Sequence, residues 1–312
     1  MTADHEWDAI VAGDLFVDLI FSGFPSWPQP GEEAFAQRFA REVGGGAAIT
    51  ACGLAKLGLK SALFAVTGKV DSFGLIERLN GCGVDTRAIQ FHSSEPAGLT
   101  VSVSTAKDRA FFTYAGANPA LLDLLLDANV RLDLARARHV HLACAPAPEL
   151  LMDLSGMLHE RGCRVSLDVG WHEDWLKDRR SLRALREIDL FMPNEREARL
   201  MTGESEPEAI LRAFAEAGLR AVALKLGPRG AALLWDEQIH RCEPYPARPL
   251  DTTGAGDGFD AGFIFGCLRG DAPAACLQAA NVCGALSTEA LGGLAAFPER
   301  DRLETALLRY GE

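Results

Sequence analysis

A glycine-rich segment near the end of the chain combines the features of an anion-binding turn with a proton acceptor. Residues 251–259 read Asp-Thr-Thr-Gly-Ala-Gly-Asp-Gly-Phe, and a small, apolar helical stretch follows over residues 261–268. Glycines at a helix start let the backbone approach an anion, and the first N–H groups and the helix dipole favour negative charge there. Asp257 would lie beside that anion, in range of a hydroxyl that attacks phosphorus. The segment indicates phosphoryl-transfer chemistry; the alternative is a turn whose aspartate only caps the helix.

Two further polar positions suit the same chemistry. Asp18 follows the first apolar run, and a carboxylate can accept hydrogen bonds from two neighbouring hydroxyls. Asn194 and Glu197 follow another apolar run. Mg²⁺ keeps several waters and takes few direct protein ligands, so one Asn and one Glu are enough to organise it. The alternatives are a solvated loop aspartate and a helix cap with a surface glutamate.

These residues need a framework of buried strands. Six continuous apolar runs alternate with helical patterns, and continuous apolarity is typical of parallel strands that are buried on both faces. Strand–helix alternation then predicts a mostly parallel sheet with helices on both sides. We expect strands over residues 9–12, 62–66, 139–143, 164–169, 188–192 and 221–226, and helices over residues 47–57, 148–161, 207–217, 274–286 and 300–309.

Two segments break this alternation. Residues 21–42 are rich in proline, glycine and aromatic residues, and residues 97–114 alternate apolar and polar positions around a polar turn at Lys107–Asp108. The second pattern is typical of an antiparallel hairpin with one solvated face. We expect both segments to pair into a small sheet that projects as a lid. The predicted division is a main domain of residues 1–14, 43–96 and 116–312 and a lid of residues 15–42 and 97–115.

The composition is that of an acidic, soluble enzyme. A formal net charge of -12 argues against nucleic acid as a partner, because non-specific binding depends on clustered Lys and Arg. None of the eight cysteines forms a Cys-x-x-Cys pair, and most lie in apolar stretches, which predicts free thiols in a reducing cytoplasm. No apolar run approaches the ~20 residues that span a bilayer. We therefore expect a cytoplasmic protein with no membrane partner.

Residues 251–257 resemble the C-terminal signature of the ribokinase-like, or PfkB, family of carbohydrate and nucleoside kinases nearly letter for letter. Other stretches resemble that family in the same order along nearly the whole chain. The resemblance implies a three-layer α/β/α sandwich with a mostly parallel central sheet and a small β lid. It also implies ATP-dependent phosphorylation of a hydroxyl, a primary CH2OH, on a small sugar or sugar-like substrate. By this resemblance Asp257 is the general base, Asp18 binds substrate hydroxyls, and the anion hole is formed by Gly254, Ala255 and Gly256.

The same resemblance assigns further residues to the site. Glu197 would hold Mg²⁺ through water. Asp251 and Thr253 stand where the family commonly binds a monovalent cation, so potassium joins ATP and Mg²⁺ as a candidate cofactor. The family often pairs two copies through the lid, which predicts a homodimer. Substrate contacts are expected from Phe16, Gly45, Gly46 and Tyr114, and nucleotide contacts from Asn194, Lys225, Gly227, Gly230 and Asn281.

Departures from the family pattern leave the substrate open. Ile49 stands where the family usually has Asn, Phe16 where several sugar kinases have Asn, and His172 where Arg is frequent. A nucleoside kinase of the same fold is one alternative, because Phe16, Trp27 and Phe35 could stack a base. A ligand-binding member without catalysis is another. A dinucleotide oxidoreductase is disfavoured because no Gly-x-Gly-x-x-Gly follows the first strand.

Overall fold

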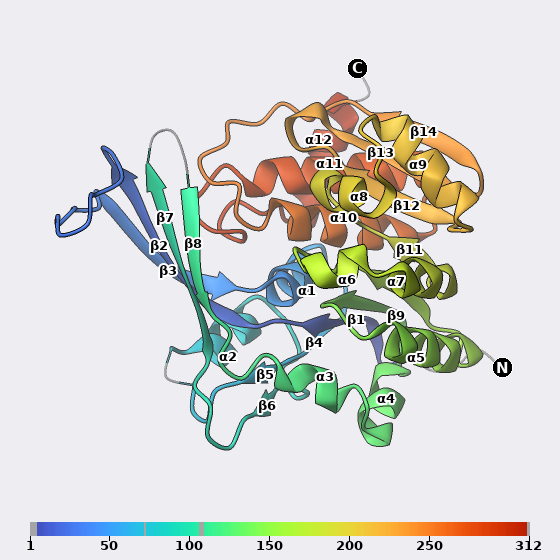
Figure 1. Ribbon diagram of the computed structural model, residues 1–312, viewed down its shortest axis with the longest axis horizontal. Helices are drawn as coiled ribbons and strands as arrows, with labels where there is room; N and C mark the ends of the chain where they lie inside the picture. The colour runs from blue at the N-terminus through green and yellow to red at the C-terminus, as the bar shows by residue number, and fades with distance from the viewer. Residues whose placement is uncertain (1–4, 72, 106–108, 311–312) are drawn as a thin grey trace.

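Eight strands form one central sheet, and helices cover both of its faces (Figure 1). The computed structural model describes residues 5–71, 73–105 and 109–310. The strand order is β14-β13-β12-β11-β10-β9-β1-β4; the strands from β4 to β12 are parallel, and β13 and β14 are antiparallel additions at one edge. This arrangement confirms the predicted α/β sandwich. The strands are β1 (Trp7–Gly13), β4 (Ser61–Phe64), β9 (Ala137–Ala143), β10 (Arg164–Leu167), β11 (Leu190–Phe191), β12 (Ala221–Lys225), β13 (Ala231–Trp235) and β14 (Gln238–Cys242).

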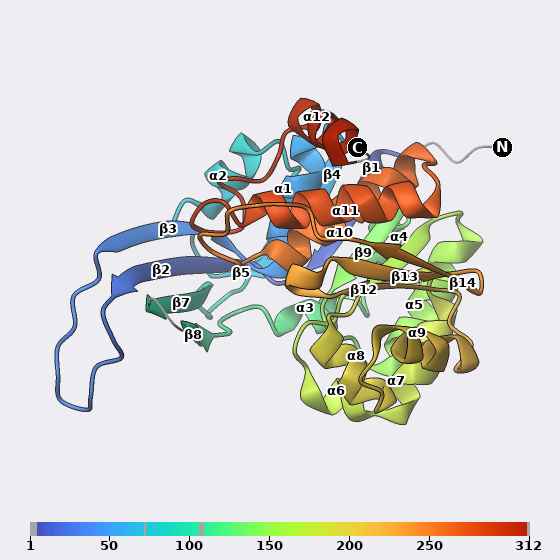
Figure 2. The same ribbon diagram turned by 90° about the horizontal axis from the view of Figure 1, so that it is seen from above.

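Each face of the sheet carries its own layer of helices (Figure 2). Apolar side chains of the two layers form separate cores on the two sides. One layer comprises α1 (Gly46–Lys56), α2 (Leu75–Gly81), α10 (Ala255–Arg269), α11 (Pro273–Ser287) and α12 (Arg300–Tyr310). The other comprises α3 (Ala120–Leu124), α4 (Ala128–Leu134), α5 (Pro148–Glu160), α6 (Glu173–Lys177), α7 (Arg179–Ala184), α8 (Glu195–Thr202) and α9 (Pro207–Glu216).

The parallel strands of the main sheet are buried on both faces, as their apolar sequences predict. In β1, Ile10 and Ala12 belong to one core and Val11 to the other, and all three are fully buried. Four strands are shorter than expected: β4, β10, β11 and β12. β4 ends at Phe64 because the chain then pairs elsewhere, as β5 (Val66–Thr67) with β6 (Gln90–Phe91), and β11 keeps only two residues. No helix in the described ranges has the length and apolarity needed to cross a membrane.

A second sheet, the lid sheet, projects from the main body in the order β3-β2-β7-β8 (Figure 1). Its strands come from both predicted lid segments: β2 (Phe16–Phe24), β3 (Arg38–Gly44), β7 (Gly98–Thr105) and β8 (Arg109–Tyr114). β2 pairs in parallel with β7, and the two outer pairs are antiparallel. β7 and β8 form the expected hairpin, whose predicted turn at Lys107–Asp108 lies outside the described residues. Because β2 follows β1 almost directly, the lid sheet starts at the carboxyl edge of the main sheet.

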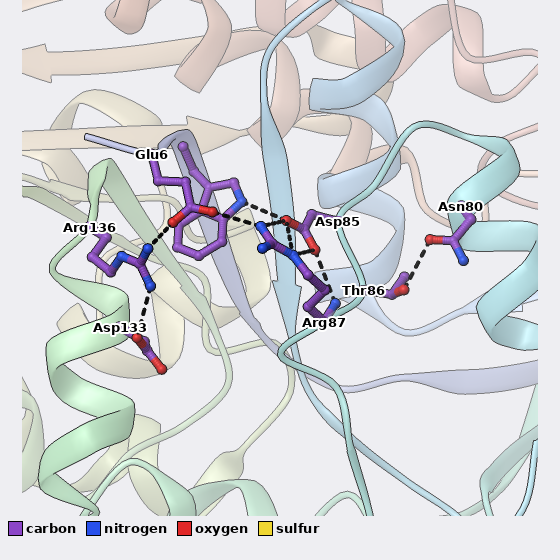
Figure 3. A network of polar contacts seen from close by, with 8 residues as sticks. Glu6, Asn80, Asp85, Thr86, Arg87, Asp133 and Arg136 are labelled. Carbon is purple, nitrogen blue, oxygen red and sulfur yellow. Dashed lines mark hydrogen bonds and ion pairs between the residues drawn. The ribbon is translucent and has the colours of Figure 1, made fainter. Parts of the chain in front are cut away.

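A polar network fixes the opposite, amino-terminal edge of the main sheet (Figure 3). Glu6 accepts hydrogen bonds from both Arg87 and Arg136. The guanidinium groups of these arginines lie 5.6 and 5.2 Å from the centre of the Trp7 ring, and the indole N–H donates to Asp85 at 3.0 Å. Such cation–π contacts add to the apolar burial of the ring. The network anchors the start of β1, whose other end leads into the lid sheet.

Candidate active site

The glycine-rich segment forms a tight loop at the start of α10. Gly254 precedes the helix with φ 73°, and a Cβ atom there would lie 2.7 Å from Gly293 Cα. Only glycine permits both the left-handed backbone and this contact. Asp251 connects this loop to a second loop, around Gly292 and Gly293, which lies between α11 and α12. Its Oδ1 accepts from the Thr253 N–H at 3.0 Å and from the Thr253 hydroxyl at 2.7 Å, and its Oδ2 accepts from the Gly292 N–H at 2.9 Å. The first N–H groups of α10, which lack intrahelical partners, therefore lie on a rigid base.

Asp257 lies in the first turn of α10 and is partly exposed. Its Oδ1 is 2.9 Å from the point that a Cβ of Gly46 would occupy, so the start of α1 faces the carboxylate without an intervening side chain. Burial raises the pKa of Asp257 to about 6; the charge of Asp168 adds to the shift, and Lys225 opposes it. A carboxylate with this pKa can exchange a proton near neutral pH.

Asp18 reaches the same space from the lid. It lies in β2, and its carboxylate lies where a side chain of Gly44 would be, because a Cβ there would fall 2.0 Å from Oδ1. Burial raises the pKa of Asp18 to about 7, and the charge of Asp257 is the next largest cause. The two carboxylates therefore approach each other across residues 44–46. Gly45, the middle residue of this turn, has φ 92° and lies against the Asp14 carbonyl.

The other two predicted substrate contacts differ in position. The Phe16 ring packs against Gly98, where a Cβ would lie 2.6 Å from Cδ1. Tyr114 is opposite Leu99 in β7, and Leu99 is opposite Val17 in β2, so these three side chains share one face of the lid sheet. Asp18 is next to Val17, and neighbouring residues of a strand point to opposite faces. Tyr114 is thus on the lid face opposite to Asp18, with 54% of its surface exposed. The structure brings Phe16 toward the base of the lid but does not bring Tyr114 together with Asp18.

Asn194 and Glu197 form a capping box at the start of α8. Asn194 Oδ1 accepts from Glu197 N at 3.0 Å, and Glu197 Oε2 accepts from Asn194 N at 2.9 Å. The helix-cap alternative is therefore correct as a description of local structure. Glu197 is nevertheless only 3% exposed, unlike a surface glutamate, and burial, followed by the charge of Asp168, raises its pKa to about 7. A buried carboxylate beside other acids gains from a nearby cation, so this pair remains suited to Mg²⁺.

Lys225, the last residue of β12, lies beside this pair. Its backbone forms a bridge with Asn194, and its N–H donates to the Pro193 carbonyl at 3.0 Å. Gly227 and Gly230 follow directly, at the start and just after the end of the 3-10 turn η2 (Gly227–Arg229). The strand end thus brings the lysine and the expected nucleotide loop to the carboxyl edge of the sheet, where α/β folds place ligands.

Asn281 is separate from these groups. Its amide in α11 donates to the Glu243 carbonyl and to the Tyr310 hydroxyl, each at 2.5 Å, and the side chain is 7% exposed. These bonds join α11 to the end of β14 and to α12. The structure does not bring Asn281 to the carboxylates, and its expected contact with the nucleotide stays a prediction.

The two residues at departures from the family pattern also have clear places. Ile49 is 2% exposed, and its methyl groups contact the Gly254 and Gly293 backbone, where added Cβ atoms would lie 3.0 and 2.9 Å away. Ile49 therefore packs against both the loop before α10 and the loop at Gly293. His172 is exposed and precedes α6, with its backbone N–H bonded to the Gly170 carbonyl.

Sequence reasoning missed Asp260, which completes a cluster of three acids. One carboxylate oxygen from each of Asp168, Asp257 and Asp260 lies within 4.8 Å of the others. Lys225 Nζ is 2.6 Å from Asp168 Oδ2 and 2.7 Å from Asp260 Oδ1, so one ammonium group contacts two of the acids. It balances the charge of one carboxylate, and burial raises the pKa of Asp260 well above its usual value. The cluster therefore fits the lysine rather than a metal ion. An acid inside the apolar run of residues 259–266 was the signal that could have revealed Asp260.

Comparison with known proteins adds a family relationship to this geometry. The model of the pfkB family of carbohydrate kinases matches residues 10–300. A 2-dehydro-3-deoxygluconokinase of Bacillus subtilis (strain 168) is 29% identical and covers 86% of this chain and 87% of its own length. Arabidopsis thaliana ribokinase complexed with ribose and ATP has a TM-score of 0.82 at 26% identity, covering 96% of this chain and 98% of that one. A candidate ribokinase II of E. coli in complex with ATP and Mg²⁺ has a TM-score of 0.79 at 25% identity, covering 97% and 99%.

These similarities extend over nearly the full length of each protein, so they include the main sheet and the lid sheet together. The matched residues also contain the loop at the start of α10 and both carboxylates that meet across the glycine turn. The chain belongs to the pfkB family of carbohydrate kinases, phosphotransferases that use an alcohol group as acceptor.

Proposed function

We propose that this kinase phosphorylates a primary hydroxyl of a small sugar, with Asp257 as the general base. The observation that carries the proposal is the meeting of Asp257 and Asp18 across residues 44–46 at the start of α10. A hydroxyl that donates a hydrogen bond to Asp257 would lie in this gap. Asp18 would hold neighbouring hydroxyls of the same sugar, since a carboxylate can accept from two of them.

The backbone at the start of α10 supports the phosphoryl group in this proposal. The N–H groups of Gly254, Ala255 and Gly256 lie at the positive end of a helix of 15 residues. Ala255 N–H makes a turn bond to the Thr252 carbonyl at 3.3 Å, near the long limit for such bonds. Negative charge that develops on the transferred group would be stabilised by these preorganised donors.

Asn194 and Glu197 are the residues proposed to hold Mg²⁺ through water, near nucleotide contacts from Lys225 and the η2 turn. Mg²⁺ neutralises phosphate charge when bound. The E. coli relative with ATP and Mg²⁺ supports both cofactors for this chain. A potassium site at Asp251 and Thr253 is a separate proposal; replacing potassium with tetramethylammonium in the assay should lower the rate if it is correct.

A sugar is favoured over a nucleoside as the substrate. Relatives at 26–29% identity include a 2-dehydro-3-deoxygluconokinase and ribokinases, one of them complexed with ribose and ATP. Two of the aromatic residues that could stack a base, Trp27 and Phe35, lie in the β2–β3 connection and are 37% and 74% exposed. A thermal-shift panel of sugars and nucleosides with a non-hydrolysable ATP analogue separates the two classes. Stabilisation by nucleosides alone would favour the nucleoside reading.

Asp257→Asn tests the catalytic assignment. We expect this variant to bind ATP as the wild type does and to lose phosphoryl transfer by about 10²–10⁴-fold, the usual contribution of a general base. Asp123→Asn, at an exposed position in α3, is the matched control and should keep full activity. Calorimetry gives ATP affinity, and a coupled ADP-release assay gives the rate. Full activity of Asp257→Asn would remove the role given to this carboxylate.

A further inference from the structure

A buried lysine lies between two carboxylates at the start of α10. The Lys225 side chain is only 10% exposed, and both Asp168 and Asp260 are within ion-pair distance of its Nζ. An unpaired buried charge is strongly unfavourable, so a buried ammonium depends on such partners. Burial alone would lower the pKa of Lys225, but the two carboxylates raise it above its usual value. The amine therefore keeps its positive charge.

The ammonium also contacts the turn that would receive the phosphoryl group. A Cβ on Gly256 would lie 3.5 Å from Lys225 Nζ, so no side chain separates the lysine from the first turn of α10. The lysine backbone is bridged to Asn194, the residue that caps α8. The positive charge thus lies between the proposed anion hole and the proposed Mg²⁺ residues.

We propose that Asp260 is a positioning residue for phosphoryl transfer, which holds the Lys225 ammonium where it stabilises charge on the transferred phosphoryl group. This inference rests on the proposed kinase function. Asp260 follows Asp257 by three residues on the same face of α10, but it is fully buried and cannot contact substrate. His141 Nε2 is 3.9 Å from Asp260 Oδ2, but burial lowers the pKa of His141 to about 3, so this ring is neutral. Among the residues that the structure describes, Lys225 is the cation that contacts Asp260. Burial raises the pKa of Asp260 well above its usual value; the charge of Asp168 adds to this shift, and Lys225 opposes it.

Two acidic side chains at contact distance restrict the ammonium more than one would. A lysine side chain loses up to ~2 kcal/mol of conformational entropy when it is held in one geometry. A charge that is fixed before the reaction needs no reorganisation during it, which is the main advantage of preorganised sites. Without Asp260, the amine would be held by Asp168 alone, and the charge on the phosphoryl group would be compensated less well.

Three variants test this role: Lys225→Met, Asp260→Asn and the double variant. We expect Lys225→Met to lower kcat by about 10²–10³-fold, the usual loss for one stabilising donor. Asp260→Asn should lower kcat at least about tenfold with little change in the KM for the sugar. The double variant should lose no more than Lys225→Met, since Asp260 acts through the lysine. Both single variants should weaken binding of Mg·ATP more than that of Mg·ADP, which lacks the transferred group.

Several results would overturn the inference. One is an Asp260→Asn variant with wild-type kcat and a wild-type ratio of ATP to ADP affinity. Another is a double variant whose losses multiply, because Asp260 would then act independently of Lys225. Thermal unfolding shows whether each variant is folded. If Asp260→Asn does not fold, Lys225→Arg replaces it as the test. Wild-type kcat in Lys225→Arg would show that the reaction does not need the exact position of the lysine ammonium. Absence of sugar phosphorylation by the wild type would refute the proposed function instead, while the affinity ratio still tests the lysine.

Discussion

Burial raises the pKa of Asp257 to about 6 and that of Asp18 to about 7, and neighbouring carboxylates add to both shifts. An ordinary aspartate with a pKa near 4 is a weak base at neutral pH. A carboxylate whose pKa is closer to the working pH combines a large ionised fraction with a stronger pull on the substrate proton. At the residue scale, crowding of acids therefore prepares Asp257 for base catalysis, and the same crowding destabilises the fold at neutral pH.

The raised pKa values predict a loss of activity in mild acid. Because these carboxyl groups take up protons at higher pH than usual, Asp257 becomes unable to accept the substrate proton below about pH 6. We expect kcat/KM for the sugar to be constant above about pH 7.5 and to fall by about tenfold per pH unit below about pH 6. Initial rates at saturating Mg·ATP over this range give the profile. Activity that stays constant down to about pH 5 would contradict the assignment.

The sequence predicted some of these residues and missed others for a physical reason. The block 251–257 is contiguous, so its types and order alone indicate an anion site with a base. The partnership of Lys225 and Asp260 links residues that are distant in sequence and on different elements, and no local pattern encodes it. The register that puts Tyr114 and Asp18 on opposite faces of the lid also depends on pairing between distant segments, because a shift of one residue moves a strand side chain to the other face.

At the scale of elements, the site depends on how closely three helix and strand ends approach. Residues 44–46 connect β3 to α1 and carry no side chains, which leaves room for Asp18 on one side and Asp257 on the other. A single methyl group in this turn would therefore compete with the substrate. The start of α1, the lid strand β2 and the start of α10 each line one side of this gap.

Gly46→Ala tests this use of space. The added methyl would lie 2.9 Å from Asp257 Oδ1, and the next atom outside that carboxyl group is Ala143 Cβ at 3.9 Å. We expect kcat/KM to fall by about 10- to 100-fold, since the methyl displaces the reacting hydroxyl. Stability should change little, because alanine is a better helix former than glycine. Gly156→Ala, in α5 with no atom within 4 Å of the new Cβ, is the control and should keep wild-type kinetics. Unchanged kinetics in Gly46→Ala would place the substrate elsewhere.

At the scale of the whole molecule, the sequence predicted the layers of the fold better than it predicted which faces of the lid sheet are exposed to solvent. Continuous apolar runs gave the buried strands, and the alternating run of residues 97–114 gave the hairpin. The alternation also implied that the polar face is solvated, but Asp18, Ser22 and Ser102 on that face are buried. The opposite, outer lid face is apolar, yet part of it is exposed. Burial of that part requires another molecule, which a single sequence cannot reveal.

The outer lid face is suited to pairing with a second copy of this chain. Register places Phe21, Phe39, Val101, Val103 and Phe112 on it, and Phe39 and Phe112 are 59% and 61% exposed. Contiguous exposed apolar side chains on a sheet with two open edge strands are typical of an association surface. We expect the protein to sediment as a dimer at micromolar concentration.

Phe112→Asp should shift this protein to the monomer, because it would bury a charge in the centre of the paired faces. Leu308→Asp replaces an equally apolar residue that is 78% exposed on α12, away from the lid, and should leave the dimer intact. Sedimentation velocity over a hundredfold range of concentration distinguishes the two outcomes. A wild type that remains monomeric throughout, or a Phe112→Asp variant that remains dimeric, would show that this face has another partner or none. A dimer lost in both variants would instead point to a surface that includes α12.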